Sequence, residues 1–450
     1  MQNKKARKAN KKIKSEIYNL KFEIKTMERF LEKIKLIFHD KGLRGRVFFV
    51  FGALVLFRAF SAIPIPGVDT ARLAEFFSNN QFFGLLNIFS GGGLANMSIV
   101  MLGVAPYITG SIIMQLGTVI SPRLKALYHE EGEAGRRRFI QYSRLLTVPL
   151  AAIQGFGLLI LLARQGVLLG GIGTAGLLVN LLVIIAGSVL LMWLGELITE
   201  FGIGNGVSLI IFAGIVSSIP SVLQQSLFTF NVAQIPLYLG FLLATIVIIA
   251  SVVSVTEAER PIPVTYAKRV RGGKMYGGVS TYLPLRLNQA GVIPIIFALS
   301  ILLFPQMMIN ILVAAGNATV SAVATWFLSV FQNQLVYGVL YFILVFLFTY
   351  FYTAVTFDPE SIATNLQKSG AFIPGVRPGH TTTLYVARIV TRITFVGALF
   401  LGIVAILPLI MQGLTGVASF AIGGTALLIV VSVVLDLVKK VDAQVSMREY

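Results

Sequence analysis

The chain has 450 residues, of which 56% are hydrophobic and only 12% are charged, and its mean hydropathy is +0.82. These values exclude a soluble globular protein of this size. The formal net charge of +18 suits a polyanionic partner such as nucleic acid, while the absence of cysteine excludes disulfides and thiolate metal sites.

The first 46 residues form a separate, strongly basic region with 15 basic and five acidic side chains. Apolar residues recur at spacings of three and four from Ile13 to Phe38, which predicts an amphipathic helix with a cationic opposite face. We expect this helix either to rest on anionic lipid or to dock on a partner. A signal peptide begins with a much shorter basic region, so we expect no cleavable signal here.

Ten later segments are long and apolar enough to cross a bilayer, whose hydrocarbon core of about 30 Å requires about 20 helical residues. We therefore expect an all-α, polytopic membrane protein with ten transmembrane helices. The segments are residues 47–63, 98–120, 145–163, 175–195, 207–223, 236–256, 289–314, 335–356, 393–412 and 418–435.

The basic residues are distributed very unequally across these spans. Of the 37 lysines and arginines, 34 fall on one side, because the opposite segments hold only Arg72 and Arg164 and the first span holds Arg58. The positive-inside rule then places both termini in the cytoplasm. Ten spans divide into two halves, 47–223 and 236–438, which have opposite orientations because each half has five crossings. We expect inverted halves around a central pore, followed by a short cytoplasmic tail at 439–450.

Two cytoplasmic connections, 257–288 and 357–392, are unusually long for a compact protein and are therefore expected to be functional. Both combine basic residues with turn formers, as in Arg269–Gly273 and Pro374–Gly379. Proline fixes φ and glycine supplies positive φ, so we expect ordered docking loops rather than disordered ones. Contact with ribosomal RNA or an acidic protein would use this surplus of basic charge.

The segment that follows the first span, 64–97, contains an apolar stretch from Phe82 to Phe89 and then the glycines Gly91–Gly93. This stretch is too short to span a bilayer, and lipid cannot satisfy irregular backbone. We expect it to fold back against protein, in the mouth of a pore.

The sequence offers little catalytic chemistry. The three histidines, His39, His129 and His380, have no metal-ligand spacing, and Gly202–Gly206 is better explained as a tight turn than as a phosphate loop. Coupled transporters keep ionisable residues inside the membrane, whereas Arg58 is the one candidate across the ten predicted spans. A passive conduit without catalytic residues, metal or cofactor is favoured; a secondary transporter for a small solute is the alternative, and a membrane-embedded enzyme ranks below both.

Several long motifs resemble the SecY/Sec61-alpha family, whose bacterial member is the central subunit of the protein-conducting channel. They cover the chain from about residue 44 to its end, and their order and spacing match the family. The motifs are Ile63–Gly67, Gly132–Arg137, Met192–Glu196, Gly202–Gly206, Leu287–Pro294 and Lys368–Gly379.

The resemblance implies a channel that passes unfolded secretory polypeptides across the bacterial plasma membrane and releases transmembrane segments sideways into lipid. It implies a lateral gate with Gln115 and Asn288, whose amides hold it closed by hydrogen bonds or simply join helices. It also implies a narrow ring of branched apolar side chains that excludes ions. The ring comprises Val104, Ile108, Val207, Ile211, Ile296 and Ile429, and the plug, within 82–96, includes Phe82, Phe83, Leu85, Leu86, Ile88, Phe89, Gly91 and Gly92.

The resemblance further implies that the cytoplasmic loops, through Arg269, Arg271 and Arg377, engage a motor or the ribosome. A guanidinium held in a rigid turn is aimed at a carboxylate or phosphate. The implied partners are the SecA motor ATPase, SecE and SecG-type small subunits, the ribosome, signal sequences, translocating chains and lipid. The basic N-terminal helix is longer than is typical of the family and the tail is short, so no partner contact is assigned to either terminus.

Overall fold

The computed structural model describes residues 39–69, 87, 90, 92–94, 96–164, 166–168, 173–228, 235–266, 269–271, 274–276, 280–314, 322–327, 329, 333–415 and 418–446. The predicted amphipathic helix before His39 lies outside these residues. So do the predicted plug residues Phe82, Phe83, Leu85, Leu86, Ile88, Phe89 and Gly91.

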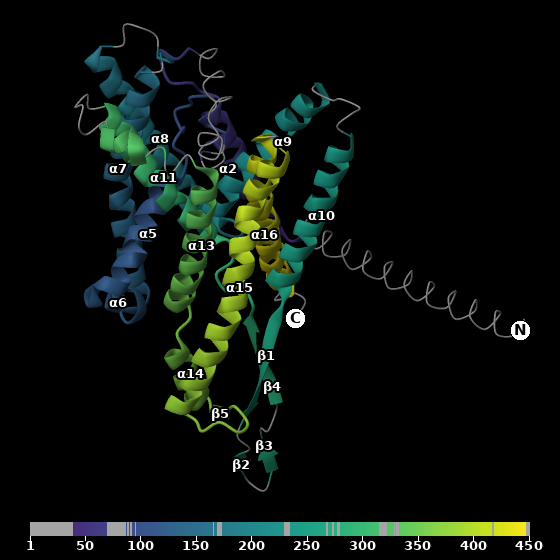
Figure 1. Ribbon diagram of the computed structural model, residues 1–450. Coiled ribbons are helices and arrows are strands. Elements are labelled where there is room, and N and C mark those ends of the chain that lie inside the picture. The colour runs from purple at the N-terminus through teal and green to yellow at the C-terminus, as the bar shows by residue number, and fades with distance from the viewer. Residues whose placement is uncertain are drawn as a thin grey trace, which may run out of the picture.

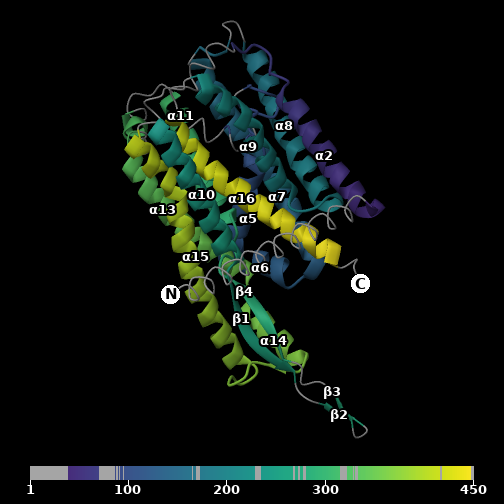
Figure 2. The ribbon, with the colours of Figure 1, turned by 90° about the vertical axis from the view of Figure 1, so that its right-hand side faces the viewer.

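Each of the ten predicted apolar segments is occupied by a helix (Figures 1 and 2). The segment 98–120 is helical only from Ala105, because residues 98–104 form turns. Shorter helices also lie between them in the described part of the chain, among them α6 (Pro122–His129) and α14 (Pro359–Lys368). The ten are α2 (Lys41–Ser61), α5 (Ala105–Ile120), α7 (Gly132–Arg164), α8 (Thr174–Phe201), α9 (Gly206–Phe228), α10 (Ile235–Glu257), α11 (Ile293–Ala314), α13 (Gln334–Thr356), α15 (His380–Thr415) and α16 (Ala418–Ser446).

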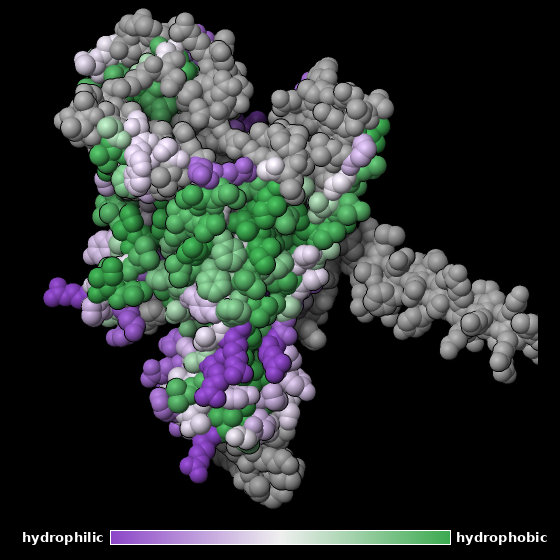
Figure 3. All heavy atoms as spheres, viewed as in Figure 1, coloured by the Kyte–Doolittle hydropathy of each residue, from purple (hydrophilic) through white to green (hydrophobic). Residues whose placement is uncertain are grey.

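Four helical stretches in the described part of the chain are long and apolar enough to cross a membrane by themselves: Gly132–Ala163, Thr174–Phe201, Gln334–Lys368 and His380–Met411. Four shorter apolar stretches occur in α5, α9, α10 and α11. The chain is therefore a mainly helical membrane protein, and the number of ten crossings stays a prediction. Apolar side chains cover the middle of the face seen in Figure 3. Hydrophilic side chains gather at the lower end of the molecule, around α14 and the strands.

Polar caps mark where the helices begin. The Asp40 carboxylate accepts a hydrogen bond from the Gly42 amide at 2.8 Å, at the start of α2. Asn333 accepts from the Leu335 amide at 3.0 Å before α13, and Asp358 accepts from the Glu360 amide at 3.0 Å before α14. These side chains satisfy amides that lack a partner within the helix, so helix ends are fixed where the apolar sequence meets polar surroundings.

The two long connections meet in one small sheet, which the sequence analysis did not predict. Strands β1 (Glu259–Tyr266) and β4 (Ser280–Arg286) pair antiparallel, and β5 (Ala371–Phe372) adds to the other edge of β1. A second, two-stranded ribbon, β2 (Arg269–Arg271) with β3 (Lys274–Tyr276), follows β1. The described residues of both connections thus include strands as well as turns, and two small sheets are added to the predicted all-α fold.

The sequence pattern does not predict this sheet because β1 contains two prolines. Pro261 and Pro263 lie in β1, and a proline lacks the N–H that a central strand donates. Strand β5, however, pairs only with Thr265 and Tyr266, so that edge of β1 is open at both prolines. The sheet buries Ile262, Val264, Leu285, Ala371 and Ile373 against Val386 and Val390 of α15, which gives it a hydrophobic core of its own.

The main hydrophobic core is one continuous cluster contributed by α2, α5, α7, α8, α9, α10, α11, α13, α15 and α16. Aromatic rings join α11 to α13 within it, since the Phe297 ring centroid lies 6.1 Å from those of Phe348 and Tyr352. Tyr341 is among the largest fully buried side chains.

The predicted cytoplasmic connections gather at one end of the molecule. Leu43 of α2, Ile203 of the turn between α8 and α9, and Val445 of α16 form a buried cluster. The Lys439 ammonium lies 3.9 Å from the Glu257 carboxylate at the end of α10. Segments that the charge pattern assigns to one side of the membrane therefore lie together in the folded chain.

Candidate functional site

The six predicted ring residues all belong to the main core or pack against it. Val104 caps the start of α5 and Ile108 lies one turn later, while Val207 and Ile211 are likewise one turn apart at the start of α9. Residues four apart share a helix face, so each pair presents two side chains in the same direction. Ile296 on α11 and Ile429 on α16 complete the set; five of the six are at most 6% exposed, and Val207 packs against them.

A tight turn brings α9 close enough to α8 to place Val207 and Ile211. The Gly206 amide donates to the Thr199 hydroxyl at 2.9 Å, and a methyl group on Gly206 would collide with the Gly195 carbonyl oxygen. Gly204 has φ +97°, which favours glycine. Residues 202–206 are therefore a close-packed turn between two helices, as the sequence predicted.

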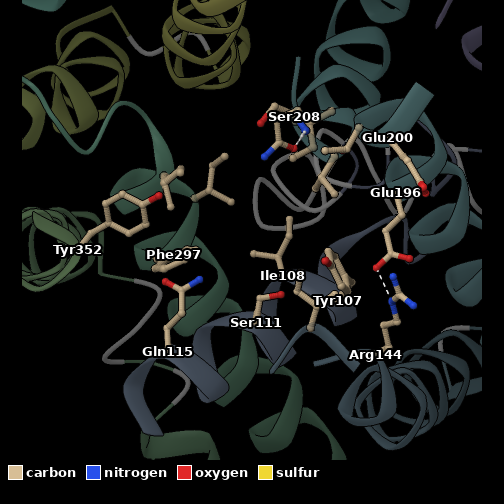
Figure 4. A pocket seen from close by; sticks show the side chains of 17 residues that line it. Tyr107, Ile108, Ser111, Gln115, Arg144, Glu196, Glu200, Ser208, Phe297 and Tyr352 are labelled. Carbon is tan, nitrogen blue, oxygen red and sulfur yellow. Dashed lines mark hydrogen bonds and ion pairs between the residues drawn. The ribbon is translucent and has the colours of Figure 1, made fainter. Parts of the chain in front are cut away.

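A cavity of about 440 Å³ adjoins this ring (Figure 4). Four ring residues, Ile108, Val207, Ile211 and Ile296, line it together with Phe297 and Tyr352. Ile140 and Ile293 also line it, and the remaining lining residues are polar: Tyr107, Ser111, Gln115, Arg144, Thr199, Glu196, Glu200, Asn205 and Ser208. The cavity is therefore apolar beside the predicted ring residues and more polar toward Arg144 of α7 and the C-terminal end of α8.

One ion pair lies at the polar side of the cavity. The Arg144 Nε donates to a Glu196 carboxylate oxygen at 2.6 Å, and the two side chains are 44% and 19% exposed. Figure 4 shows the pair beside Tyr107, which lies within electrostatic reach of both charges and is hydrogen-bonded to Ser111. Glu196 lies at the end of a predicted span, and Arg144 has no predicted role. Because the two residues are 52 positions apart, no local sequence pattern indicates their contact.

The predicted gate amides, Gln115 and Asn288, are not joined to each other in this structure. Gln115 lines the cavity, while the Asn288 side chain is 7% exposed and donates to the Gly291 carbonyl oxygen at 3.1 Å, just before α11. Within the described residues, the amide oxygens of both are buried without a hydrogen-bond partner. Asn288 here stabilises the turn into α11, and a gate role for either residue stays a prediction.

The C-terminal end of the predicted plug is built into the core. The Leu94 amide donates to the Ser90 hydroxyl at 2.9 Å, and Leu94 is 0% exposed. The Ile65 amide donates to the Met97 carbonyl at 2.8 Å, and the Ile99 amide to the Ile63 carbonyl at 2.9 Å. The described residues between Ser90 and Ile99 are thus anchored to the chain after α2 through Met97 and Ile99. Gly92 has φ +83°, and a methyl group built on it would meet Arg58 and Ser217, so the first-span arginine lies beside this turn.

We expect Gly187→Ala to lower the free energy of unfolding by about 1–3 kcal/mol, the usual effect of overpacking a core. A methyl group at Gly187 on α8 would collide with the Ile99 carbonyl oxygen, which belongs to the anchored turn. Gly240→Ala on α10 is the control, because a methyl group there meets nothing within 4 Å and alanine favours helix. Thermal unfolding in detergent measures both; equal melting temperatures would contradict the close approach.

The predicted docking arginines lie at the end where the sheet is. Arg377 is exposed in a turn whose Val376 amide donates to the Ile373 carbonyl at 3.0 Å, while the Thr382 hydroxyl donates to the Arg377 carbonyl at 2.8 Å. Arg269 and Arg271 belong to β2, in the ribbon beyond the sheet. The structure does not bring them to the cavity. Within the part of the chain that the structure describes, no cluster of His, Asp and Glu suits a metal ion.

The chain is a bundle of apolar helices with a buried apolar core and a cavity that four of the predicted ring residues line. These features define a polytopic membrane protein. Comparison with known proteins agrees. The SecY family model matches residues 98–438, and the chain belongs to the SecY family.

Among curated proteins, the protein translocase subunit SecY of Streptomyces coelicolor is 42% identical over 431 residues, which cover 92% of this chain and 97% of the relative. A solved structure concerned with the plug domain of SecY superposes with a TM-score of 0.63 at 20% identity, over 89% and 92% of the two chains. Sec61 in a canine ribosome–channel complex superposes with a TM-score of 0.58 at 18% identity, over the same shares. These likenesses establish the fold.

Proposed function

We propose that this chain is the channel subunit that passes unfolded secretory polypeptides across a bacterial plasma membrane and releases transmembrane segments sideways into the bilayer. The observation that carries the proposal is that four of the six apolar side chains, from α5, α9 and α11, line one cavity, while all six belong to the main core or pack against it. A narrow apolar ring excludes water and ions yet has no affinity for a particular side chain, so it suits a conduit for varied polypeptides.

The same proposal assigns roles to the surrounding parts. Residues 82–96 are the plug on the outer side, and Gln115 and Asn288 lie at the lateral gate. Both termini and the loops carrying Arg269, Arg271 and Arg377 face the cytoplasm, supported by the 34 basic residues on that side. The basic loops engage the ribosome or the SecA motor, which supplies the energy, and SecE and SecG-type subunits pack on the outside of the helices. One structural neighbour is a channel in a complex with the ribosome, which supports the first of these partners.

Crosslinking from the ring tests the channel directly. The chain contains no cysteine, so Ile211→Cys and Ile296→Cys each introduce a unique thiol. A secretory precursor stalled by a folded C-terminal domain is expected to crosslink to both positions, because the polypeptide must pass the ring. Leu191→Cys is the control: it belongs to the same buried cluster but does not line the cavity.

Failure to crosslink at either ring position, with the precursor bound to the complex, would overturn the ring assignment. A reconstituted protein that exchanges a small solute but never crosslinks to a precursor would instead support the secondary transporter.

A further inference from the structure

The cavity lies between helices that belong to different halves of the chain. Tyr107, Ser111 and Gln115 of α5 and Ile140 and Arg144 of α7 line it from the first half; Ile293, Ile296 and Phe297 of α11 and Tyr352 of α13 line it from the second. Helix α7 packs directly against α11, and α5 also contacts α11. If the cavity widens sideways, as lateral release requires, then α5 and α7 must separate from α11.

Helices α7 and α11 contact each other directly, and Ile140 of α7 lines the same cavity as Ile293 and Ile296 of α11. The described side-chain bonds of Ser143, Arg144 and Thr147 on α7 are made within α7 or to α8. In a bilayer, an apolar helix surface gains little by exchanging lipid for another apolar surface. Separation of α7 from α11 therefore costs little beyond lost packing, provided that lipid or an apolar segment takes the vacated place.

On its other sides, α7 is held by specific contacts. The Arg144–Glu196 pair at 2.6 Å joins it to α8, and the Tyr128 and Phe139 rings, 4.9 Å apart, join it to α6. A methyl group on Gly110 of α5 would lie 3.1 Å from the Ser143 carbonyl oxygen, so α5 and α7 approach closely. Helix α11 is held in turn by α13 through the Phe297 ring. Each helix is thus bound to its own half.

We infer that the Arg144–Glu196 ion pair is a positioning device that keeps α7 with α8 while α7 separates from α11. A charge-assisted hydrogen bond is stronger than a neutral one, and Glu196 is only 19% exposed, so water competes poorly for it. The inference rests on the proposed lateral release of transmembrane segments. It adds that this pair prevents α7 from leaving α8 when the channel opens.

Spin labels on the otherwise cysteine-free chain test the inference. Cysteines introduced at Leu145 on α7, Trp193 on α8 and Leu347 on α13 are suitable, because these side chains are 68%, 57% and 57% exposed. Distances are measured in the reconstituted complex, with and without a stalled chain that carries an apolar segment. In the unsubstituted background, loading is expected to lengthen the 145–347 distance and leave the 145–193 distance unchanged.

Glu196→Gln removes the negative charge at nearly constant shape, and Arg144→Gln replaces the guanidinium with a shorter, neutral amide. Both are expected to broaden the 145–193 distribution toward longer distances on loading. The double variant that exchanges the two residues, Arg144→Glu with Glu196→Arg, is expected to narrow the 145–193 distance distribution again. Arg138→Gln is the matched control, because Arg138 also lies on α7 and is 67% exposed, but it pairs at 3.9 Å with Glu131, just before the start of α7, rather than with α8. This variant is expected to change neither distance.

The outcomes distinguish failure of the positioning role from failure of the proposed lateral release. A 145–193 distribution that stays narrow in both single variants would overturn the positioning role, even where the 145–347 distance lengthens normally. Broadening in the single variants that the exchanged pair does not reverse would show that the charges act on other groups, and would overturn the pairing. A 145–347 distance that never lengthens in the unsubstituted background would instead contradict lateral release itself.

Discussion

Replacing Arg377 with glutamate is expected to abolish motor-driven export while leaving membrane insertion and folding intact. The Arg377 side chain is exposed, and its turn is held by backbone contacts, including the Thr382 hydroxyl bond to the Arg377 carbonyl at 2.8 Å. The turn therefore keeps its shape when the side chain changes. A carboxylate at this position would repel the acidic or phosphate group that the guanidinium is proposed to meet, and charge repulsion adds to the lost bidentate contact.

Export of a secretory precursor into membrane vesicles, driven by the motor and ATP, measures this effect. Arg388→Glu on α15 is the matched control, because Arg388 is also an exposed arginine of the same region but lies on a regular helix outside the turn. An export rate that Arg377→Glu leaves unchanged would refute the docking role. A loss of folded protein in that variant would contradict the view that backbone contacts hold the turn.

Deleting residues 82–89 is expected to turn a closed channel into one that conducts ions. These residues contain the apolar part of the proposed plug, and without it the ring alone separates two aqueous sides. The deletion ends before the anchored turn. Leu94 therefore stays buried, and the Asn96 side-chain amide keeps its 3.3 Å hydrogen bond to the Ser61 carbonyl oxygen. Among the bonds of the described residues, the deletion removes those that Ser90 and Gly92 make to the Asn87 carbonyl at 2.9 and 2.8 Å.

Conductance of reconstituted protein in planar bilayers measures the leak. The longer deletion, 82–96, is the informative comparison: it is also expected to leak, but it removes Leu94 and should lower the melting temperature as well. If protein with the shorter deletion is folded and inserted but the bilayer does not conduct ions, the plug assignment would be contradicted. Equal melting temperatures for the two deletions would contradict the structural role of residues 90–96.

Hydrophobicity was sufficient to predict the helices but not their ends. All ten apolar segments are helical, since burying backbone in lipid leaves few other solutions. The segment at 98–120, however, begins with turns, because Met97 with φ 46° and Gly103 with φ 59° bend the chain before α5. An apolar stretch does not distinguish a buried turn from a helix.

Contacts between distant residues could not be predicted from local patterns. Ring residues such as Ile211 and Ile429 were assigned through family resemblance, because a buried isoleucine in one helix resembles any other. The Arg144–Glu196 pair and the β1–β5 pairing depend on how helices and loops meet in space. The absence of a bond between Gln115 and Asn288 likewise reflects local geometry, since the Asn288 amide is used by the turn at Gly291.

The small sheet determines how this region can be exchanged between proteins. Strand β1 pairs with β4 through Glu259↔Arg286 and with β5 through Thr265↔Phe372, and Ile262 and Ile373 share one core with Val386. The two long connections are thus a single interlocked module. A chimera that transplants only one of them leaves a strand without its partner and the first turns of α15 without their cover, whereas 257–288 and 357–392 moved together carry their own interior with them.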